Sequence, residues 1–243
     1  MHSTSKTMVT GVGSGLGKFI HNSLPNSIGI DRSNHAKIMR EAKSQSYDLI
    51  IHCAFDPKHH VEDYYKYFKD NLQFTQELLE IPHKKFIYLS TIDVYREENS
   101  IYKFTKLMAE SIVENNCINH LIVRCSALLG PTMRENTFLK LMNKTLTKTG
   151  LSKDSEFNYV LYEDIYEFFV QANNKNLVGI FNLVSKDNIS LQQVSDYFGC
   201  TPQFGDFIYT TPLVKGNIPA EVSSINNRTS LDNIKRFKTS YGK

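Results

Sequence analysis

The chain has 243 residues, of which 41% are hydrophobic and 22% are charged, and these fractions are typical of a globular protein. The net charge of +3 and the lack of any Lys or Arg run exclude a strongly basic nucleic-acid-binding surface. No segment is apolar over the length of a signal peptide or a membrane span, so we expect no membrane partner and a cytoplasmic location. The cysteines lack zinc-ligand spacing, which predicts reduced thiols and no metal site: Cys53, Cys117, Cys125 and Cys200.

A glycine-rich loop lies between the first predicted strand (residues 7–10) and a helix that ends near Leu24, before Pro25. Glycines at this place allow a tight turn and a close approach of backbone to a pyrophosphate, at which the helix amino terminus points. The segment therefore predicts a dinucleotide site formed by Gly11, Gly13, Ser14, Gly15, Leu16 and Gly17.

The second predicted strand, residues 27–31, ends in Asp31, twenty residues after Gly11. Dinucleotide-binding folds place an acid here that hydrogen-bonds the adenosine ribose hydroxyls. Such an acid repels a ribose phosphate, so Asp31 favours NAD over NADP. The adjacent Arg32 could instead receive that phosphate, and Asp31 could instead cap the following helix.

The next segments alternate between helix and strand. We predict helices over residues 35–44, 61–81 and 137–146, and strands over residues 47–54, 86–89 and 120–124. This alternation predicts an α/β protein with a Rossmann-type doubly wound parallel sheet, whose ligands bind at the carboxyl ends of the strands.

The candidate catalytic residues follow the strand over residues 86–89. Tyr102 and Lys106 lie one turn apart on one face of a predicted helix that begins at Ile101. An ammonium close to a phenol favours the phenolate, which can then act as an acid or base near neutral pH. Thr91, at the end of the strand, could hydrogen-bond the same substrate oxygen. The alternative is an exposed Tyr and Lys on a helix surface.

After Gly150 the pattern changes to short elements: strands over residues 157–161 and 179–184, and helices over residues 163–172 and 191–198. From Thr201 the chain is polar and rich in turn-forming residues. We therefore divide the chain into a dinucleotide-binding domain (residues 1–150) and a small C-terminal substrate-binding cap (residues 151–243), some of whose segments return to the core sheet.

Seven segments together resemble the extended branch of the short-chain dehydrogenase/reductase superfamily, the NAD-dependent epimerase/dehydratase family. These segments, in chain order, are TGVGSGLG, DLIIHCAF, STIDVY, YKFTKLMAE, RCSALLGP, YVLYEDIYEFF and GIFNLVSKDNISLQQV. The glycine loop departs from the pattern of this branch. The glycines follow the spacing of the shorter members, and Ser14 stands where the extended branch has its middle glycine.

The resemblance implies a role for each matching residue. Thr91 contacts the substrate oxygen, Tyr102 is the acid/base, and Lys106 activates Tyr102 and binds the nicotinamide ribose. Asn71 resembles a family asparagine, although a helix-surface amide fits it equally well. Further residues are implied beside the cofactor, namely Cys53, Ala54, Phe55, Ser90, Cys125 and Ser126, or beside the substrate, namely Asp93, Arg134 and Arg228.

The resemblance also implies a nucleotide-sugar substrate, NAD as cofactor with NADP as the alternative, and a homodimer built on the helices over residues 61–81 and 101–114. The expected reaction is that of an epimerase or a 4-ketoreductase. A 4,6-dehydratase is less favoured, because Ile92 replaces the first residue of an acidic pair and only Asp93 remains. A non-catalytic dinucleotide-binding sensor or scaffold on the same fold is the alternative of a different class.

Overall fold

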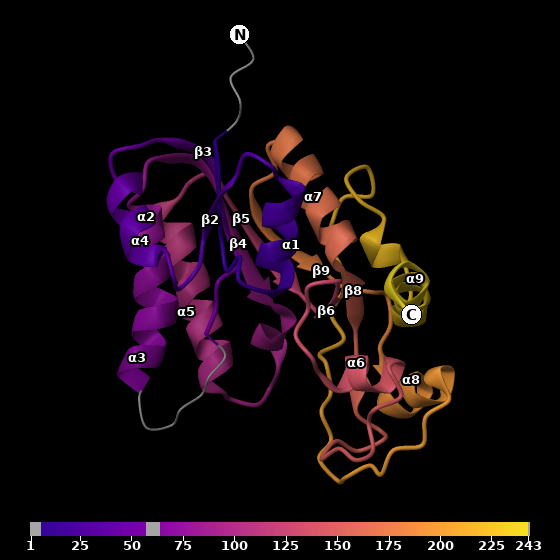
Figure 1. The fold of residues 1–243 in the computed structure, drawn as a ribbon. Helices are drawn as coiled ribbons and strands as arrows, with labels where there is room; N and C mark the ends of the chain where they lie inside the picture. Colours follow the sequence, from indigo (N-terminus) through magenta and orange to yellow (C-terminus); the bar gives the residue numbers. More distant parts are fainter. Residues whose placement is uncertain (1–5, 57–63, 243) are drawn as a thin grey trace. The chain divides into compact units, whose positions relative to one another are not determined.

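The computed structural model describes residues 6–56 and 64–242 (Figure 1). The chain forms two compact units. The first comprises Met1–Arg124 with Asn176–Phe181, and the second comprises Cys125–Lys175 with Asn182–Lys243. The assignment of cofactor and substrate binding to residues 1–150 and 151–243 stays a prediction.

The described residues contain one six-stranded sheet with the order β2-β1-β3-β4-β5-β9. Neighbouring strands run parallel where β1 meets β2 and β3, and where β3 meets β4. The predicted Rossmann-type α/β fold is confirmed. The strands are β1 (Thr7–Thr10), β2 (Ile28–Ile30), β3 (Tyr47–His52), β4 (His83–Thr91), β5 (His120–Cys125) and β9 (Gly179–Leu183).

The chain order of the strands reverses at β1. The connection through α1 (Gly15–Ser23) leads to β2 on one side of β1, and α2 (His35–Ala42) leads to β3 on the other side. Ligands of open α/β sheets bind outside the carboxyl ends of the strands at such a reversal. The fold therefore places the segments after β1 and β3 together at the binding position of the sheet.

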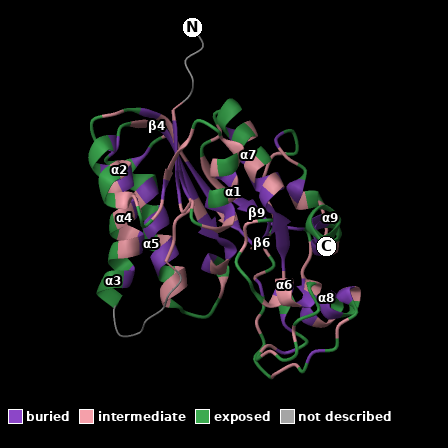
Figure 2. Cartoon of the chain, in the orientation of Figure 1, coloured by how far each residue is buried: buried purple, intermediate pink, exposed green. Residues whose placement is uncertain are grey.

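The core of the first unit forms because both faces of the sheet carry apolar side chains, as expected for parallel strands covered by helices. The strands are buried and the outer faces of the helices are exposed (Figure 2). Fully buried members of this core are Met8, Ile50, Leu78, Phe86, Val113 and Ile122.

The long helix predicted over residues 61–81 is described from Tyr64 onward, and residues 61–63 lie outside the described residues. It consists of α3 (Tyr64–Phe68), one π-helical turn (Lys69–Gln73) and α4 (Phe74–Leu79). The sequence periodicity did not predict the π-helical turn. Such turns occur frequently at functional sites, and this one contains Asn71.

The strand predicted over residues 157–161 is two strands in the second unit. β7 (Glu156–Phe157) pairs antiparallel with β10 (Ile189–Ser190), and β8 (Tyr159–Leu161) pairs parallel with β6 (Ala127–Leu129). The buried Asn158 separates them, and its amide nitrogen donates to the carbonyl oxygens of Ser185 (2.9 Å) and Asp187 (2.7 Å). The helices are α6 (Thr137–Met142), α7 (Tyr162–Asn174), α8 (Leu191–Phe198) and α9 (Ser230–Tyr241).

The helix α9 lies in the tail, a polar segment rich in turn-forming residues for which we predicted no helix. Thr229 and Asp232 form a reciprocal capping box at its start, which is a helix signal readable from sequence. Ile234 and Phe237 are buried in the core of the second unit, where the Phe237 ring lies 5.8 Å from that of Phe138. None of the described helices is long and apolar enough to cross a membrane.

Candidate functional site

The glycine loop between β1 and α1 brings the helix amino terminus close to the strand. Gly11 has a positive φ of +77°, and a side chain at Gly17 would lie 2.6 Å from the carbonyl oxygens of Thr10 and Gly11. A side chain at Gly13 would meet nothing within 4 Å, so this part of the loop is open. The free N–H groups of a helix amino terminus bind phosphate. These residues therefore fit a dinucleotide pyrophosphate, with Ser14, Gly15 and Leu16 forming the start of α1.

Asp31 follows β2 and is held as a carboxylate. Its Oδ1 accepts hydrogen bonds from the Ser33 hydroxyl (2.5 Å) and the Ser33 backbone nitrogen (2.8 Å). These two bonds lower the pKa of Asp31, the hydroxyl contributing most. The N-cap of α2 is Asn34, so Asp31 does not have the capping role that we considered.

Arg32 forms an ion pair that the sequence interpretation missed. Its guanidinium lies 3.1 Å from the carboxylate of Asp56, in the segment after β3. The Arg32 side chain is 76% exposed, whereas that of Asp56 is 15% exposed. The two predicted adenosine-site residues, Asp31 and Arg32, are thus adjacent to a third charged residue.

A chain of hydrogen bonds runs from β1 through His52 to the long helix. Thr10 and His52 are partners on neighbouring strands, and the Thr10 hydroxyl lies 2.7 Å from His52 Nδ1. The Thr75 hydroxyl donates to the Asn71 carbonyl (2.7 Å), so its oxygen accepts from His52 Nε2 at 3.0 Å. His52 therefore carries a hydrogen on Nε2, and because burial lowers its pKa to about 3 the ring is neutral at pH 7. Thr10 also accepts from the backbone nitrogen of Ala54 (3.0 Å), which fixes the segment after β3.

Asn71 is a buried clamp on that segment. Its side-chain oxygen accepts from the Asp56 backbone nitrogen (2.8 Å), and its side-chain nitrogen donates to the backbone oxygens of Asp56 (3.3 Å) and Tyr67 (3.0 Å). Asn71 is only 3% exposed, so the interpretation as a helix-surface amide is wrong. The π-helical turn that contains Asn71 thus holds the backbone of Asp56.

The burial of His52 predicts a pH dependence of stability. Burial, and then the charge of Lys106, lower the pKa of His52 to about 3. Unfolded histidine titrates near ~6.5, so below that pH the unfolded chain binds a proton that the folded chain does not. We expect this group to reduce the free energy of unfolding by about 1.4 kcal/mol per pH unit as pH falls from about 6.5 toward 3, and to have no effect above.

Urea unfolding at a series of pH values measures this slope. The variant His52→Gln is expected to show a shallower dependence below pH ~6.5, because the titrating ring is gone. An equal slope in both proteins would assign the acid sensitivity to other groups.

The candidate catalytic residues come from β4 and the start of α5 (Ile101–Asn116). Thr91 is the last residue of β4, and its hydroxyl oxygen accepts from the Asp93 backbone nitrogen (3.1 Å), which leaves the hydroxyl hydrogen available to donate. Tyr102 and Lys106 lie in the first two turns of α5. The buried Lys106 Nζ donates to the Leu89 carbonyl oxygen of β4 (2.8 Å), so Lys106 is not an exposed surface lysine.

The ring of Phe55 contacts both Tyr102 and Lys106. Lys106 Nζ lies 4.2 Å from the centroid of the Phe55 ring, and the Phe55 and Tyr102 rings meet edge to face with centroids 5.2 Å apart. The ring of Tyr88 lies 4.8 Å from the same ammonium. Aromatic faces attract an ammonium, so these rings hold Lys106 at the carboxyl end of β4.

A buried ion pair between Glu110 and Arg124 connects β4, α5 and β5 next to these residues. Ser90 donates its hydroxyl hydrogen to Glu110 of α5, and the Arg124 guanidinium binds the same carboxylate through Nε and Nη2. Arg124 Nη1 also donates to the Tyr95 hydroxyl (2.6 Å). Ser90, predicted beside the cofactor, therefore joins β4 to α5, and only its oxygen remains to accept a hydrogen bond.

The remaining predicted site residues have diverse surroundings. Burial raises the pKa of the Cys53 thiol to about 12, so the thiol stays protonated at neutral pH. Cys125 ends β5, and the buried Ser126 hydroxyl has no hydrogen-bond partner among the described residues. Arg134 is exposed in the loop before α6. No group of three His, Cys, Asp or Glu side chains suited to a metal occurs in the described part of the chain.

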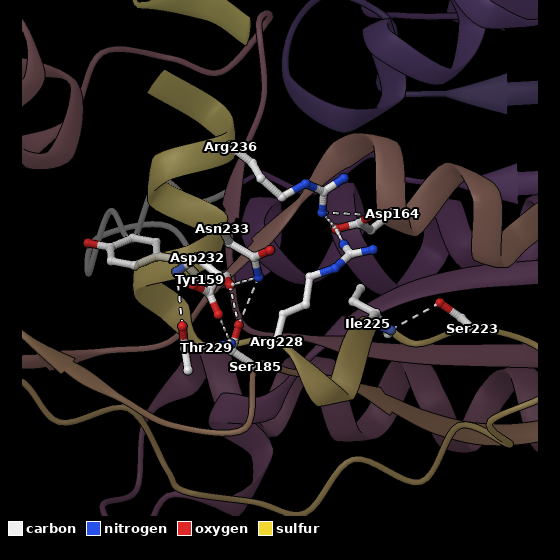
Figure 3. A network of polar contacts seen from close by, with 10 residues as sticks. All are labelled: Tyr159, Asp164, Ser185, Ser223, Ile225, Arg228, Thr229, Asp232, Asn233 and Arg236. Atoms are coloured by element: carbon white, nitrogen blue, oxygen red, sulfur yellow. Dashed lines mark hydrogen bonds and ion pairs between the residues drawn. The ribbon is translucent and has the colours of Figure 1, made fainter. Parts of the chain in front are cut away.

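Arg228 belongs to a charged cluster within the second unit (Figure 3). Its guanidinium pairs with the buried carboxylate of Asp164, and the Arg236 guanidinium binds the same carboxylate at 3.0 Å. Two guanidinium groups on one carboxylate leave a net positive charge. Arg236 lies on α9, so the sequence interpretation missed it together with that helix.

The fold is shared with several solved structures. A dTDP-4-dehydrorhamnose reductase from Bacillus anthracis str. Ames, in complex with NADP, is 15% identical with a TM-score of 0.81, covering 97% of this chain and 99% of that one. A UDP-glucuronic acid 4-epimerase from Bacillus cereus, in complex with NAD, is 19% identical with a TM-score of 0.73, covering 97% and 99%. WbmG from Bordetella bronchiseptica, in complex with NAD, is 13% identical with a TM-score of 0.74, covering 99% and 96%.

No curated protein matches the chain. The family model described as the NAD dependent epimerase/dehydratase family matches residues 5–164, which is more than half of the chain. This segment contains the glycine loop, Asp31, Thr91, Tyr102 and Lys106. The resemblance seen in the sequence is thereby confirmed, and the chain belongs to the NAD dependent epimerase/dehydratase family.

Proposed function

We propose that the protein is an NAD(P)-dependent oxidoreductase that acts on a nucleotide-activated sugar, as an epimerase or a 4-ketoreductase. The observation that carries this proposal is the position of Lys106, whose ammonium is fixed at the carboxyl end of β4 one helical turn from Tyr102. Thr91 ends the same strand, and the open glycine loop belongs to the same unit. The names of the similar reductase and 4-epimerase support the substrate class.

In the proposed mechanism, Tyr102 moves the proton of the sugar hydroxyl. A free phenol has a pKa near ~10, and a nearby ammonium favours the phenolate. As the carbon loses its hydride, the Tyr102 phenolate removes the hydroxyl proton, and in the reducing direction the phenol returns it. The Thr91 hydroxyl donates to the same oxygen. A bound nicotinamide dinucleotide supplies or accepts the hydride.

The retention of dinucleotide tests the proposal and separates its two versions. An epimerase oxidises and then reduces its substrate, so it keeps its cofactor, whereas a ketoreductase releases oxidised cofactor after each turnover. A native mass spectrum of the purified protein that shows bound NAD supports the epimerase. An empty protein that binds added NADH or NADPH supports the ketoreductase. A protein that binds neither contradicts both versions.

A non-catalytic dinucleotide sensor is the second candidate, and the contacts of Phe55 are the observation that favours it. An aromatic ring on the Lys106 ammonium competes with the ribose and phenolate that this group serves in the proposed reaction. If the protein is a sensor, Phe55→Ala changes the dissociation constant for the dinucleotide. In that case neither the wild type nor the variant converts a nucleotide sugar. A 4,6-dehydratase remains the least favoured candidate, since Ile92 and Asp93 follow Thr91 directly and only one of these two positions is acidic.

Two arginines of the second unit, Arg134 and Arg228, are the proposed contacts for the substrate diphosphate. Guanidinium groups bind phosphate oxygens through paired hydrogen bonds. Arg228 is oriented by Asp164, and Arg134 is exposed before α6. We also propose a cytoplasmic location, because Cys53, Cys117, Cys125 and Cys200 are not joined in disulfides.

A homodimer is the proposed assembly, formed through α3 and α5. The large apolar side chains of Tyr65, Phe68, Phe104 and Met108 are exposed on these helices. Contiguous exposed apolar surface marks protein–protein interfaces. We expect light scattering to give the mass of a dimer for the wild type and of a monomer for the double variant Phe104→Glu/Met108→Glu.

The matched control is Ile118→Glu, because Ile118 is 96% exposed and lies outside these helices. This variant is expected to remain dimeric. A wild-type mass equal to one chain would contradict the proposed dimer.

A further inference from the structure

Three charged side chains lie at the end of the sheet where the adenosine ribose of a dinucleotide binds. Asp31 and Arg32 follow β2, and Asp56 follows β3. β1, which carries the glycine loop, lies between β2 and β3 in the sheet. The summed charge of these three groups is −1 when all are ionised. This charge disfavours an additional phosphate.

The charge of Asp31 is fixed by its local structure. Both hydrogen bonds from Ser33 reach the same oxygen, Oδ1, and keep the group ionised. The second oxygen, Oδ2, has no hydrogen bond from the described residues, so it can accept from ribose hydroxyls.

Arg32 is the side chain that would attract a ribose phosphate, but Asp56 holds it. The guanidinium and carboxylate lie 3.1 Å apart. Asp56 cannot easily follow Arg32 elsewhere, because the buried Asn71 binds both its backbone nitrogen (2.8 Å) and its backbone oxygen (3.3 Å). The exposed Arg32 side chain therefore pairs with a carboxylate, that of Asp56, whose backbone is held in place by Asn71.

We propose that Asp56 determines the phosphate state of the cofactor: by pairing with Arg32 it denies that arginine to a 2′-phosphate, so the protein selects NAD(H) over NADP(H). The inference deepens the proposed function, but it requires only that the site binds a dinucleotide. Removal of the Asp56 charge changes the local sum from −1 to zero and releases Arg32 to bind the phosphate.

Dissociation constants for NADH and NADPH, from nicotinamide fluorescence titrations, test the proposal in four proteins. These are the wild type, Asp56→Asn, Arg32→Gln and the double variant. We expect the wild type to bind NADH at least about tenfold more tightly than NADPH. In Asp56→Asn, the ratio of the dissociation constant for NADPH to that for NADH is expected to fall at least about fivefold, because NADPH binds more tightly. The gain in NADPH affinity should disappear in the double variant, because the gain depends on the Arg32 guanidinium that Asp56→Asn releases.

Asp70→Asn is the matched control. Asp70 pairs with Lys66, and the pKa of Lys66 is raised chiefly by Asp70 and more weakly by Asp56. This substitution therefore removes a carboxylate in the same neighbourhood that does not hold Arg32. It is expected to leave the ratio of the two dissociation constants within about twofold of the wild type.

Three outcomes would overturn the proposal. These are tighter binding of NADPH than NADH by the wild type, equal gains for Asp56→Asn and Asp70→Asn, or a gain that persists in the double variant. Because the measurement is binding, a protein that selects NADH without converting a sugar supports this inference and counts against the proposed enzyme. A protein that binds neither dinucleotide contradicts both.

Discussion

The substitution Tyr102→Phe is expected to reduce turnover of a nucleotide sugar by at least about 100-fold, the lower end of the contribution of a positioned acid/base. The hydroxyl is the only group lost, and the Phe ring can keep the edge-to-face contact with Phe55. The dissociation constant for NADH should therefore change less than about threefold. Initial rates and a fluorescence titration on the same preparation measure the two quantities.

The control is Tyr65→Phe, which removes the same hydroxyl from a side chain that is exposed on α3. Its turnover should equal that of the wild type. Full turnover by Tyr102→Phe would remove the acid/base role from Tyr102. A parallel loss of turnover and of NADH affinity would instead indicate that the hydroxyl is needed for binding.

The substitution Arg124→Met is expected to reduce the free energy of unfolding by about 3–5 kcal/mol, the cost of leaving one partner of a buried ion pair without its counter-charge. Glu110 is 2% exposed and receives hydrogen bonds from Arg124 and Ser90. Without the guanidinium, a buried carboxylate keeps only the Ser90 hydroxyl of the hydrogen bonds that the structure shows. Tyr95 loses the hydrogen bond to Arg124 as well. Urea unfolding at neutral pH measures the change.

Two further variants separate this explanation from a general loss of packing. The double variant Glu110→Leu/Arg124→Met removes both charges and should recover most of the lost stability. Arg96→Met breaks the pair with the exposed Glu98, and pairs of this kind contribute about 0–1 kcal/mol. If Arg124→Met and Arg96→Met cost the same, the Glu110–Arg124 pair does not stabilise the site as we describe.

The catalytic candidates can be picked out from the sequence because their signals are local. The glycines lie within one loop, and the i, i+4 spacing of Tyr102 and Lys106 defines their common face on α5 before any tertiary contact is known. The strands around them are short apolar runs, which parallel sheets require. Local signals also explain why β1 and α8 begin and end at the predicted residues.

The residues that support the site could not be predicted, because their roles depend on contacts between distant segments. Asp56, in the segment after β3, pairs with Arg32, in the segment after β2. Asn71 binds Asp56 from the π-helical turn between α3 and α4. Burial of Glu110 is visible only once Arg124 is placed beside it. By contrast, the capping box that begins at Thr229 was a readable signal for α9.

The most direct test of the proposed function is to incubate the protein with UDP-sugars and dTDP-sugars, their 4-keto forms included, in the presence of NAD and NADH. Nucleotide sugars are then separated and identified by mass spectrometry and by comparison with standards. The proposed function predicts either an isomer of one sugar without net use of cofactor, or reduction of a 4-keto sugar with one NADH consumed per product. In either case Tyr102→Phe should form the product at least about 100-fold more slowly. Unchanged sugars with a protein that has bound its dinucleotide would contradict an enzyme of this type and favour the sensor.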